Sequence, residues 1–337
     1  MLIEQNKSLK DYNTFGIDCK AKYYVSVTTT DELIEILSNK KYEERFILGG
    51  GSNMLLTQDI NALVIHLNLK GITVLSETEE QVQIEALAGE NWHQFVLSCI
   101  ERGYGGLENL SLIPGNVGTA PIQNIGAYGV ELKDTFESCK AIEIETKTEV
   151  KFPKEACNFG YRTSIFKNEE RGKYIITSVV FNLTKVNHKK SISYGAIKQQ
   201  LSDNNIKKPT IKNISDTVIS IRESKLPDPK KLGNSGSFFK NPMIDVETFR
   251  QFRVKFPEAP FYEVSPTEFK IPAGWLIEQA GFKGKQFGDA GVHKNQALVL
   301  VNYGNATGSE IWELAVRIQT EVKEKFGIYI EPEVNVI

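Results

Sequence analysis

The feature that most constrains the fold of this chain is an uncharged run within residues 105–131, GGLENLSLIPGNVGTAPIQNIGAYGVE. No side chain between Asn109 and Tyr128 is charged, over a length that would suit a membrane helix. Pro114 and Pro121 break the run, however, and glycines and amides surround them, so it predicts neither a membrane helix nor a core helix. The run instead predicts buried irregular backbone. Buried amide groups need partners, and a large polar ligand can supply them. The run therefore predicts a cofactor-binding surface, and we call residues 109–128 the bed.

Composition sets the broad class of the protein. A chain of 337 residues is long enough for two or three domains with hydrophobic cores. The formal net charge of -2 gives no reason to expect a nucleic acid or an anionic membrane as a partner. The N-terminus lacks the apolar core of a signal peptide and no segment resembles a transmembrane helix, so we expect a cytoplasmic protein.

Cysteine and histidine spacing indicates reduced thiols and no metal site. No CxxC pair, HExxH or His-x-His spacing is present, so neither a disulfide framework nor a zinc site is expected. The cysteines are Cys19, Cys99, Cys139 and Cys157.

Local patterns predict strands and helices throughout the first half. Residues 22–27 are β-rich, and residues 29–32 (TTDE) resemble a capping box ahead of an apolar helical face. Residues 45–48 predict a short strand, and residues 92–100 place apolar side chains on one helical face that stops at Gly103. Alternating runs between about 130 and 185 indicate antiparallel strands.

The second half contains a predicted linker and three helices. Residues 185–209 are polar and poor in pattern, which predicts a linker. The helices are expected at residues 215–225, halted by Pro227, at residues 272–281, and from a Ser309 cap to a Gly327 stop. The expected class is α+β, with an N-terminal α/β lobe, a larger strand-rich lobe and a C-terminal α+β lobe.

A glycine-rich turn follows the predicted strand at residues 45–48. A tight turn there would aim successive N–H groups at an anion. It lacks the third glycine of a dinucleotide-binding GxGxxG and the lysine of a Walker loop, so a plain turn and a pyrophosphate-binding loop both remain open. The predicted cofactor-binding run downstream favours the pyrophosphate-binding loop. The turn consists of Gly49, Gly50, Gly51, Ser52 and Asn53.

Three further runs carry groups that suit catalysis. Arg162, in FGYRTS, offers a bidentate fork for a carboxylate, although such an arginine is often a structural ion pair. Ser237, in GNSGSFFKNP, has small neighbours that leave its hydroxyl accessible, but no histidine base lies near it, which disfavours acyl transfer. Glu333, in EPE, follows a short apolar run, where acids are usually solvated.

Together and in this order, the motifs LGGGSN, PIQNIGAYGVE, FGYRTSIFK, GNSGSFFKNP and EPEV resemble the UDP-N-acetylenolpyruvoylglucosamine reductase family. The resemblance covers nearly the whole chain and is closest to the longer, type I form, because Tyr194 is present in its SYG context. It implies a vanillyl-alcohol-oxidase-like FAD-binding fold over residues 17–187, built from lobes of about 1–65 and 66–210. It also implies a substrate-binding domain over residues 211–325 and a tail, 326–337, that returns to the active site.

The resemblance further implies a reaction in peptidoglycan precursor synthesis and a set of site residues. FAD takes hydride from NADPH and gives it to the enolpyruvyl group of a nucleotide sugar. Ser237 matches the proton donor, and Arg162 and Glu333 match the pair that binds the substrate carboxylate. The matched substrate contacts are Tyr128, Tyr194, Lys225, Asn241 and Gln296. The matched FAD contacts are the glycine-rich turn with Thr119, Pro121, Ile122, Asn124 and Gly126.

One departure from the family pattern lies in the bed. Relatives often carry two small hydroxyl residues where this chain has Thr119 and Ala120, so a hydrogen bond from position 120 to the flavin is not available. Two alternatives to the reductase remain at this point: another FAD-dependent oxidase or dehydrogenase of the same fold, and a non-catalytic nucleotide-sugar binding protein. In each case we expect a monomer with a small-molecule partner.

Overall fold

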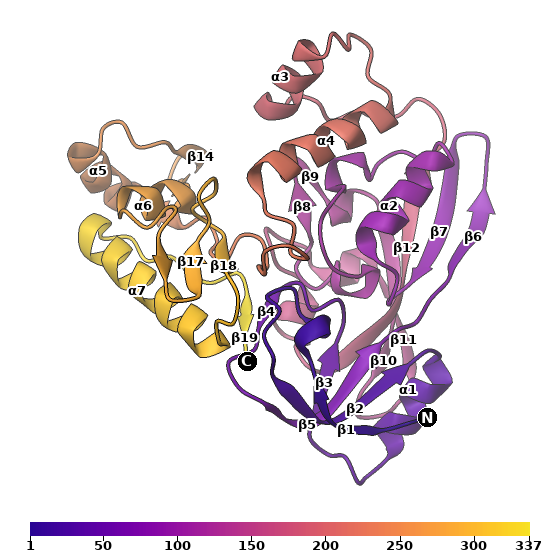
Figure 1. Cartoon of the computed structure of the whole chain (residues 1–337). Helices are drawn as coiled ribbons and strands as arrows, with labels where there is room; N and C mark the ends of the chain where they lie inside the picture. The colour runs from indigo at the N-terminus through magenta and orange to yellow at the C-terminus, as the bar shows by residue number, and fades with distance from the viewer. The chain divides into compact units, whose positions relative to one another are not determined.

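The computed structural model describes all 337 residues and divides into two compact units. Figure 1 traces the elements of both along the chain. The first unit consists of Met1–Lys7, Ala21–Gly50 and Ile60–Arg222. The second consists of Ser8–Lys20, Gly51–Asp59 and Glu223–Ile337. Each unit is therefore assembled from three separate stretches of sequence.

A small sheet with one helix begins the first unit. Its strand order is β1 (Glu4–Ser8), β2 (Lys20–Val27), β5 (Ile60–Leu67), β3 (Arg45–Leu48), and β5 pairs in parallel with β2 and β3. Helix α1 (Thr30–Ser38) buries Leu33, Ile36 and Leu37 in the core of this sheet. The predicted capping box is confirmed: Thr29 accepts a hydrogen bond from the Glu32 amide, and the Glu32 carboxylate accepts one from the Thr29 amide.

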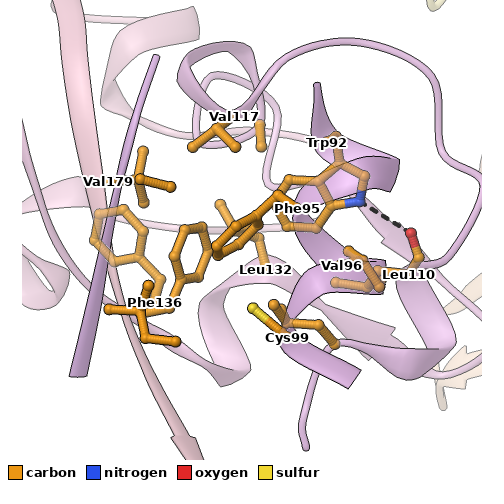
Figure 2. Close-up of a cluster of buried hydrophobic side chains, with 14 of the residues drawn as sticks. Trp92, Phe95, Val96, Cys99, Leu110, Val117, Leu132, Phe136 and Val179 are labelled. Carbon is orange, nitrogen blue, oxygen red and sulfur yellow. Dashed lines mark hydrogen bonds between the residues drawn. The ribbon is translucent and has the colours of Figure 1, made fainter. Parts of the chain in front are cut away.

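A larger antiparallel sheet forms the second lobe of this unit and confirms the strands expected between residues 130 and 185. Helix α2 (Trp92–Glu101) packs against it through Trp92, Phe95, Val96 and Cys99, as Figure 2 shows. The Trp92 indole N–H donates to the Leu110 carbonyl at 2.9 Å, so the helix also holds the start of the uncharged run. The strand order is β11 (Glu149–Pro153), β10 (Phe136–Glu143), β12 (Tyr174–Thr184), β7 (Gln81–Leu87), β6 (Ile72–Glu77).

The uncharged run is irregular, as predicted, and its residues are mainly buried or half-buried. It contains the 3-10 helix Val117–Thr119 and the two-residue strand β8 (Gly126–Ala127), and it is flanked by the 3-10 helix Glu108–Leu110 and the strand β9 (Val130–Glu131). Some of its backbone hydrogen bonds are made with the loop before α2. The Val117 amide donates to the Glu90 carbonyl and the Gly118 amide donates to the Ala88 carbonyl, both at 2.9 Å. The run therefore does not need a helix or a long strand to satisfy its amides.

Two helices close the first unit and correct the sequence prediction. The linker expected at residues 185–209 is wrong, because α3 (Gly195–Asp203) lies within it. Only Ile197 and Leu201 of α3 are buried, and one apolar pair gives too little periodicity to detect. Helix α4 (Ile211–Lys225) starts earlier than expected and packs its apolar stripe on α3, and the first compact unit ends within it, at Arg222.

The second unit contains two small antiparallel sheets and three helices. Helix α7 (Gly308–Phe326) contacts β17 (Ala290–Val292) and β18 (Leu300–Asn302). None of the helices in the structure is long and apolar enough to cross a bilayer. The sheets are β13 (Met243–Asp245), β15 (Glu268–Lys270), β14 (Tyr262–Ser265) and β16 (Gln286–Phe287), β17 (Ala290–Val292), β18 (Leu300–Asn302). The helices are α5 (Val246–Lys255), α6 (Ala273–Gln279) and α7 (Gly308–Phe326).

The ends of α7 show one correct and one wrong prediction. Gly327 ends the helix at φ 70°, as expected. Ser309 is not the N-cap: Thr307 caps the helix, forming a capping box with Glu310, and the Ser309 hydroxyl donates to the Thr57 carbonyl at 3.1 Å. Thr307 and Ser309 are both possible caps in the sequence, and the acid three residues after Thr307 decides between them.

The four cysteines should be unreactive in the folded protein. All are free and buried. Burial raises the pKa of Cys19 to about 11 and that of Cys99 to about 12, and a hydrogen bond with Cys157 together with burial raises the pKa of Cys139. Because the thiolate is the nucleophile, we expect no thiol to react with DTNB at pH 8 within minutes, and all four to react in guanidinium chloride. Rapid labelling of the native protein would contradict this.

Candidate active site

Arg162 lies at the tip of a tight turn in the first unit. We call residues 159–164 the arginine loop. Gly160 and Thr163 exchange backbone hydrogen bonds of 3.1 and 3.3 Å, and Arg162 between them has the left-handed φ of 56°. Its guanidinium donates to the Gly126 carbonyl at 2.5 Å and lies 5.4 Å from the centre of the Tyr161 ring. The arginine is therefore held against the uncharged run.

Tyr128 lies at the end of the uncharged run and contacts a second predicted tyrosine. Its ring is 5.4 Å from that of Tyr194, at an interplanar angle of 87°. Its hydroxyl hydrogen-bonds with the Arg222 guanidinium. Burial raises the pKa of Tyr128, and the positive charge of Arg222 only partly opposes this, so the phenol is neutral at pH 7.

Arg222 was not among the predicted site residues. Its Nε donates to the Leu112 carbonyl at 3.1 Å, and burial lowers the pKa of its guanidinium. The sequence contains a signal for this position, because Arg222 lies four residues after Val218 and next to Ile221 on the apolar stripe of α4. A cation on the buried side of a helix indicates a specific partner.

Ser237 and Glu333 are brought together in the second unit by backbone pairing. Phe239 forms an antiparallel bridge with Pro332, and the Glu333 amide donates to the Phe238 carbonyl at 2.8 Å. The chain from Ser237 onward therefore runs alongside the EPE segment. The sequence identified both acid and serine but contained no signal for this pairing.

The same segment contacts the glycine-rich turn. The Asn53 amide group donates to the Glu333 carbonyl at 3.3 Å, and β4 (Met54–Leu55) pairs in parallel with β19 (Asn335–Val336). The chain after residue 330 thus returns to two of the predicted motifs, Ser237 and Asn53, within one unit.

The glycines of the turn pack where no side chain fits. At Gly51 the φ is 59°, and a Cβ would lie 1.9 Å from the Tyr12 carbonyl oxygen. In the first unit a Cβ on Gly50 would lie 2.9 Å from the Gly115 Cα, and one on Gly49 2.6 Å from the Thr119 side chain. The loop is therefore built for close approach of backbone to backbone, as cofactor-binding loops are.

Two buried hydroxyls in the second unit fit a polar ligand. The Oγ atoms of Thr14 and Ser235 are buried and lack a hydrogen-bond partner. Their segments are adjacent, since the Asn234 amide donates to the Thr14 carbonyl at 2.9 Å. Unpaired buried hydroxyls destabilise a fold unless a ligand or water completes them. Within this unit, the two hydroxyls suit a large polar cofactor such as FAD.

The bed residues predicted to contact FAD differ in their exposure. Ile122 is 38% exposed, and Pro121 is buried. Thr119 is half-buried and its hydroxyl donates to the Asn116 carbonyl at 2.8 Å. Ala120 is 2% exposed and belongs to the hydrophobic core of the strand-rich lobe. The methyl group of Ala120 is thus accounted for by core packing.

Two of the expected substrate contacts meet at the start of α6. The Asn241 side-chain oxygen accepts a hydrogen bond from the Ala273 amide at 2.9 Å. A Cβ on Gly274 would lie 3.3 Å from the Gln296 side-chain oxygen. Lys225, the last residue of α4, is exposed.

Comparison with known proteins decides the family. The profile of the UDP-N-acetylenolpyruvoylglucosamine reductase C-terminal domain matches residues 228–337, and that of an FAD binding domain matches residues 21–149. The chain is 63% identical over 337 residues to the UDP-N-acetylenolpyruvoylglucosamine reductase of Flavobacterium johnsoniae, covering 100% of both. The chain belongs to the UDP-N-acetylenolpyruvoylglucosamine reductase family.

Other relatives agree with this assignment. UDP-N-acetylenolpyruvoylglucosamine reductases of Amoebophilus asiaticus and Pseudomonas aeruginosa are 48% and 45% identical, each over at least 98% of both chains. The crystal structure of UDP-N-acetylenolpyruvylglucosamine reductase from Thermus caldophilus shares the fold, with a TM-score of 0.68 at 24% identity over 100% of this chain and 99% of that one. The α+β class and the FAD-binding fold expected from the sequence are confirmed.

The close packing at Gly51 gives a test of the turn as part of the flavin site. Gly51→Ala places a methyl group against the backbone of Tyr12, so we expect a loss of several kcal/mol in unfolding free energy and little bound flavin. Gly103→Ala is the matched control, since Gly103 has φ 76° with open space around it. The control should cost about 1 kcal/mol and leave flavin absorbance unchanged. Denaturant titration and flavin absorbance measure both, and equal effects would contradict the assignment.

Proposed function

We propose that Ser237, Arg162 and Glu333 are the catalytic residues of the family's reaction in this chain. That reaction is the NADPH-dependent reduction of UDP-N-acetylglucosamine enolpyruvate to UDP-N-acetylmuramate through FAD, in peptidoglycan precursor synthesis. Bound FAD supplies the hydride chemistry, accepting hydride from NADPH and passing it to the vinyl ether. The protein binds the substrate, stabilises charge and delivers a proton.

The proposed role of Arg162 follows from where charge develops. Hydride addition to one carbon of the vinyl ether leaves negative charge on the neighbouring carbon, beside the carboxylate. A guanidinium binds that carboxylate with two parallel hydrogen bonds and stabilises the enolate-like intermediate. The arginine loop supports this role, because it holds the guanidinium against the uncharged run through the hydrogen bond to the Gly126 carbonyl.

Ser237 is proposed to protonate the intermediate. A serine hydroxyl is a weak acid near neutral pH, but the carbanion is strongly basic, so the proton transfer is favourable. Glu333, in its protonated form, is proposed to donate a hydrogen bond to the substrate carboxylate. The observation that best supports this assignment is the backbone pairing around Phe239 and Pro332, which holds serine and glutamate in adjacent segments.

The substrate contacts expected from the family are proposed here as well. Tyr194, Lys225 and Asn241 would hold the diphosphate or close over the nucleotide sugar, and Gln296 would add a further contact. The shared position of Asn241 and Gln296 at the start of α6 supports a common role. Tyr128, neutral and next to Tyr194, presents a hydroxyl suited to a sugar or phosphate oxygen.

We further propose that the protein works as a monomer in the cytoplasm. Four buried free thiols suit a reducing compartment. Light scattering on the flavin-loaded protein, against the chain mass of 37.9 kDa, measures the oligomeric state.

The role of Ser237 is tested by separating the two half-reactions. Ser237→Ala should leave flavin reduction by NADPH nearly unchanged and slow flavin reoxidation by the enolpyruvyl substrate at least about a hundredfold, because only the second step needs the proton. Stopped-flow absorbance of the flavin follows each step. Ser309→Ala, an exposed serine at the start of α7, is the control. Equal loss of both half-reactions would show that Ser237 is only structural.

A further inference from the structure

Asn124 has a side chain whose polar atoms are all engaged inside the first unit. The residue is 0% exposed and has the left-handed φ of 43°. Its amide nitrogen donates to the Gly160 carbonyl at 3.0 Å and to a Glu131 carboxylate oxygen at 3.1 Å. Its amide oxygen accepts from the Lys133 backbone N–H at 3.1 Å. An asparagine amide has two donor hydrogens, so none remains for a ligand.

Hydrogen bonds at residues 122, 124 and 126 of the bed join it to the arginine loop. Alternate residues of the bed each hold one residue of the loop. Besides the Asn124–Gly160 bond, the Ser164 hydroxyl donates to the Ile122 carbonyl at 2.7 Å, and Arg162 donates to the Gly126 carbonyl at 2.5 Å. In the other two bonds the loop supplies the side chain. Asn124 is the one of the three bed residues that reaches the loop with its own side chain.

The bond to Gly160 acts on the turn that carries Arg162. Gly160 pairs with Thr163 to close that turn, and Arg162 sits inside it in a left-handed conformation. Left-handed backbone at a non-glycine residue costs about 1–2 kcal/mol and persists only where neighbouring contacts hold it. Without an anchor at Gly160 the turn can relax, and the guanidinium moves with it.

We propose that Asn124 is a positioning residue that fixes Arg162 relative to the bed. This inference rests on the proposed role of Arg162 as the carboxylate-binding residue. The amide of Asn124 is engaged inside the protein, so positioning replaces the direct side-chain contact with FAD that the family resemblance implies. Misplacing a catalytic group by about 1 Å can cost about 100-fold in rate, so an anchor of this kind has a measurable effect.

Asn124→Ala and Asn158→Ala form a matched pair for the test. Asn158 lies in the segment leading into the same loop and has a similar φ of 45°, but it is exposed and caps only the 3-10 helix Lys154–Cys157. Both variants place alanine in left-handed backbone, so the cost of backbone strain is matched. We expect Asn124→Ala to slow flavin reoxidation by the enolpyruvyl substrate by about 10- to 100-fold, with flavin content and reduction by NADPH within about twofold. Asn158→Ala should change none of these beyond about twofold.

Combination with an Arg162 variant shows whether Asn124 acts through the arginine. In the Arg162→Ala background, Asn124→Ala should add less than about twofold to the loss, because residues that act as a unit are not additive. Full multiplication of the two effects overturns the inference. So does an Asn124→Ala protein that behaves like Asn158→Ala, or one that loses flavin, since the residue would then support the bed and not the loop.

A second variant shows whether a loss seen with Asn124→Ala comes from backbone strain or misfolding. Asn124→Gly removes the side chain while relieving the left-handed strain, and it should show the same selective loss of reoxidation. If Arg162→Ala alone reoxidises at the normal rate, the proposed role of Arg162 is wrong, which separates that failure from a failure of the Asn124 inference.

Discussion

The hydrogen bonds that satisfy the irregular backbone of the bed fix the part of the first unit on which the proposed roles of its residues depend. A buried N–H or C=O without a partner costs about 1–3 kcal/mol, and this run has only short 3-10 turns and two-residue strands to pair them. The structure supplies further partners from outside the run. The Trp92 amide donates to the Gly115 carbonyl, and the Trp92 indole to the Leu110 carbonyl, so one residue at the start of α2 binds the run twice.

Leu112 shows how far this external support extends. It has a left-handed φ of 58°, and both of its backbone groups are bound by side chains: its N–H by His93 and its C=O by Arg222. Helices α2 and α4 therefore bind the two backbone groups of the same residue. Because Arg222 also bonds Tyr128, the two ends of the uncharged run share one guanidinium. A neutral bed can thus be rigid although its own sequence favours no regular structure.

Sequence patterns predicted those parts of the fold that depend on neighbours along the chain. The capping box at Thr29, the C-terminal glycine at Gly327 and the alternation of the antiparallel strands are local and were correct. Helix α3 was missed because two buried side chains make no periodic signal, and Thr307 competed with Ser309 as a cap within two residues. Local rules fail where the deciding contact is absent from the local sequence.

The sequence motifs predict a set of candidate site residues but not their geometry. The motifs identified Ser237, Glu333 and Asn53, and their arrangement depends on backbone pairing between segments far apart in sequence. Asn124 was expected at the cofactor, and its actual partners, Gly160 and Glu131, follow no spacing rule. Resemblance to a family indicates which residues of this chain match the family's site positions. The hydrogen-bond partners of those residues come only from the structure.

The second unit is assembled from three separate stretches of the chain, and this limits how the genes of such enzymes can recombine. The stretch matched by the C-terminal family profile, residues 228–337, is contiguous in sequence, as a domain exchanged between relatives would be. Its strand β19, however, pairs with β4, and Asn302 donates to the carbonyl of Phe15, so its integrity relies on two short pieces encoded near the start of the gene. A crossover between those pieces and residue 228 separates segments that hydrogen-bond to each other. We expect natural chimaeras in this lineage to inherit all three stretches from one parent.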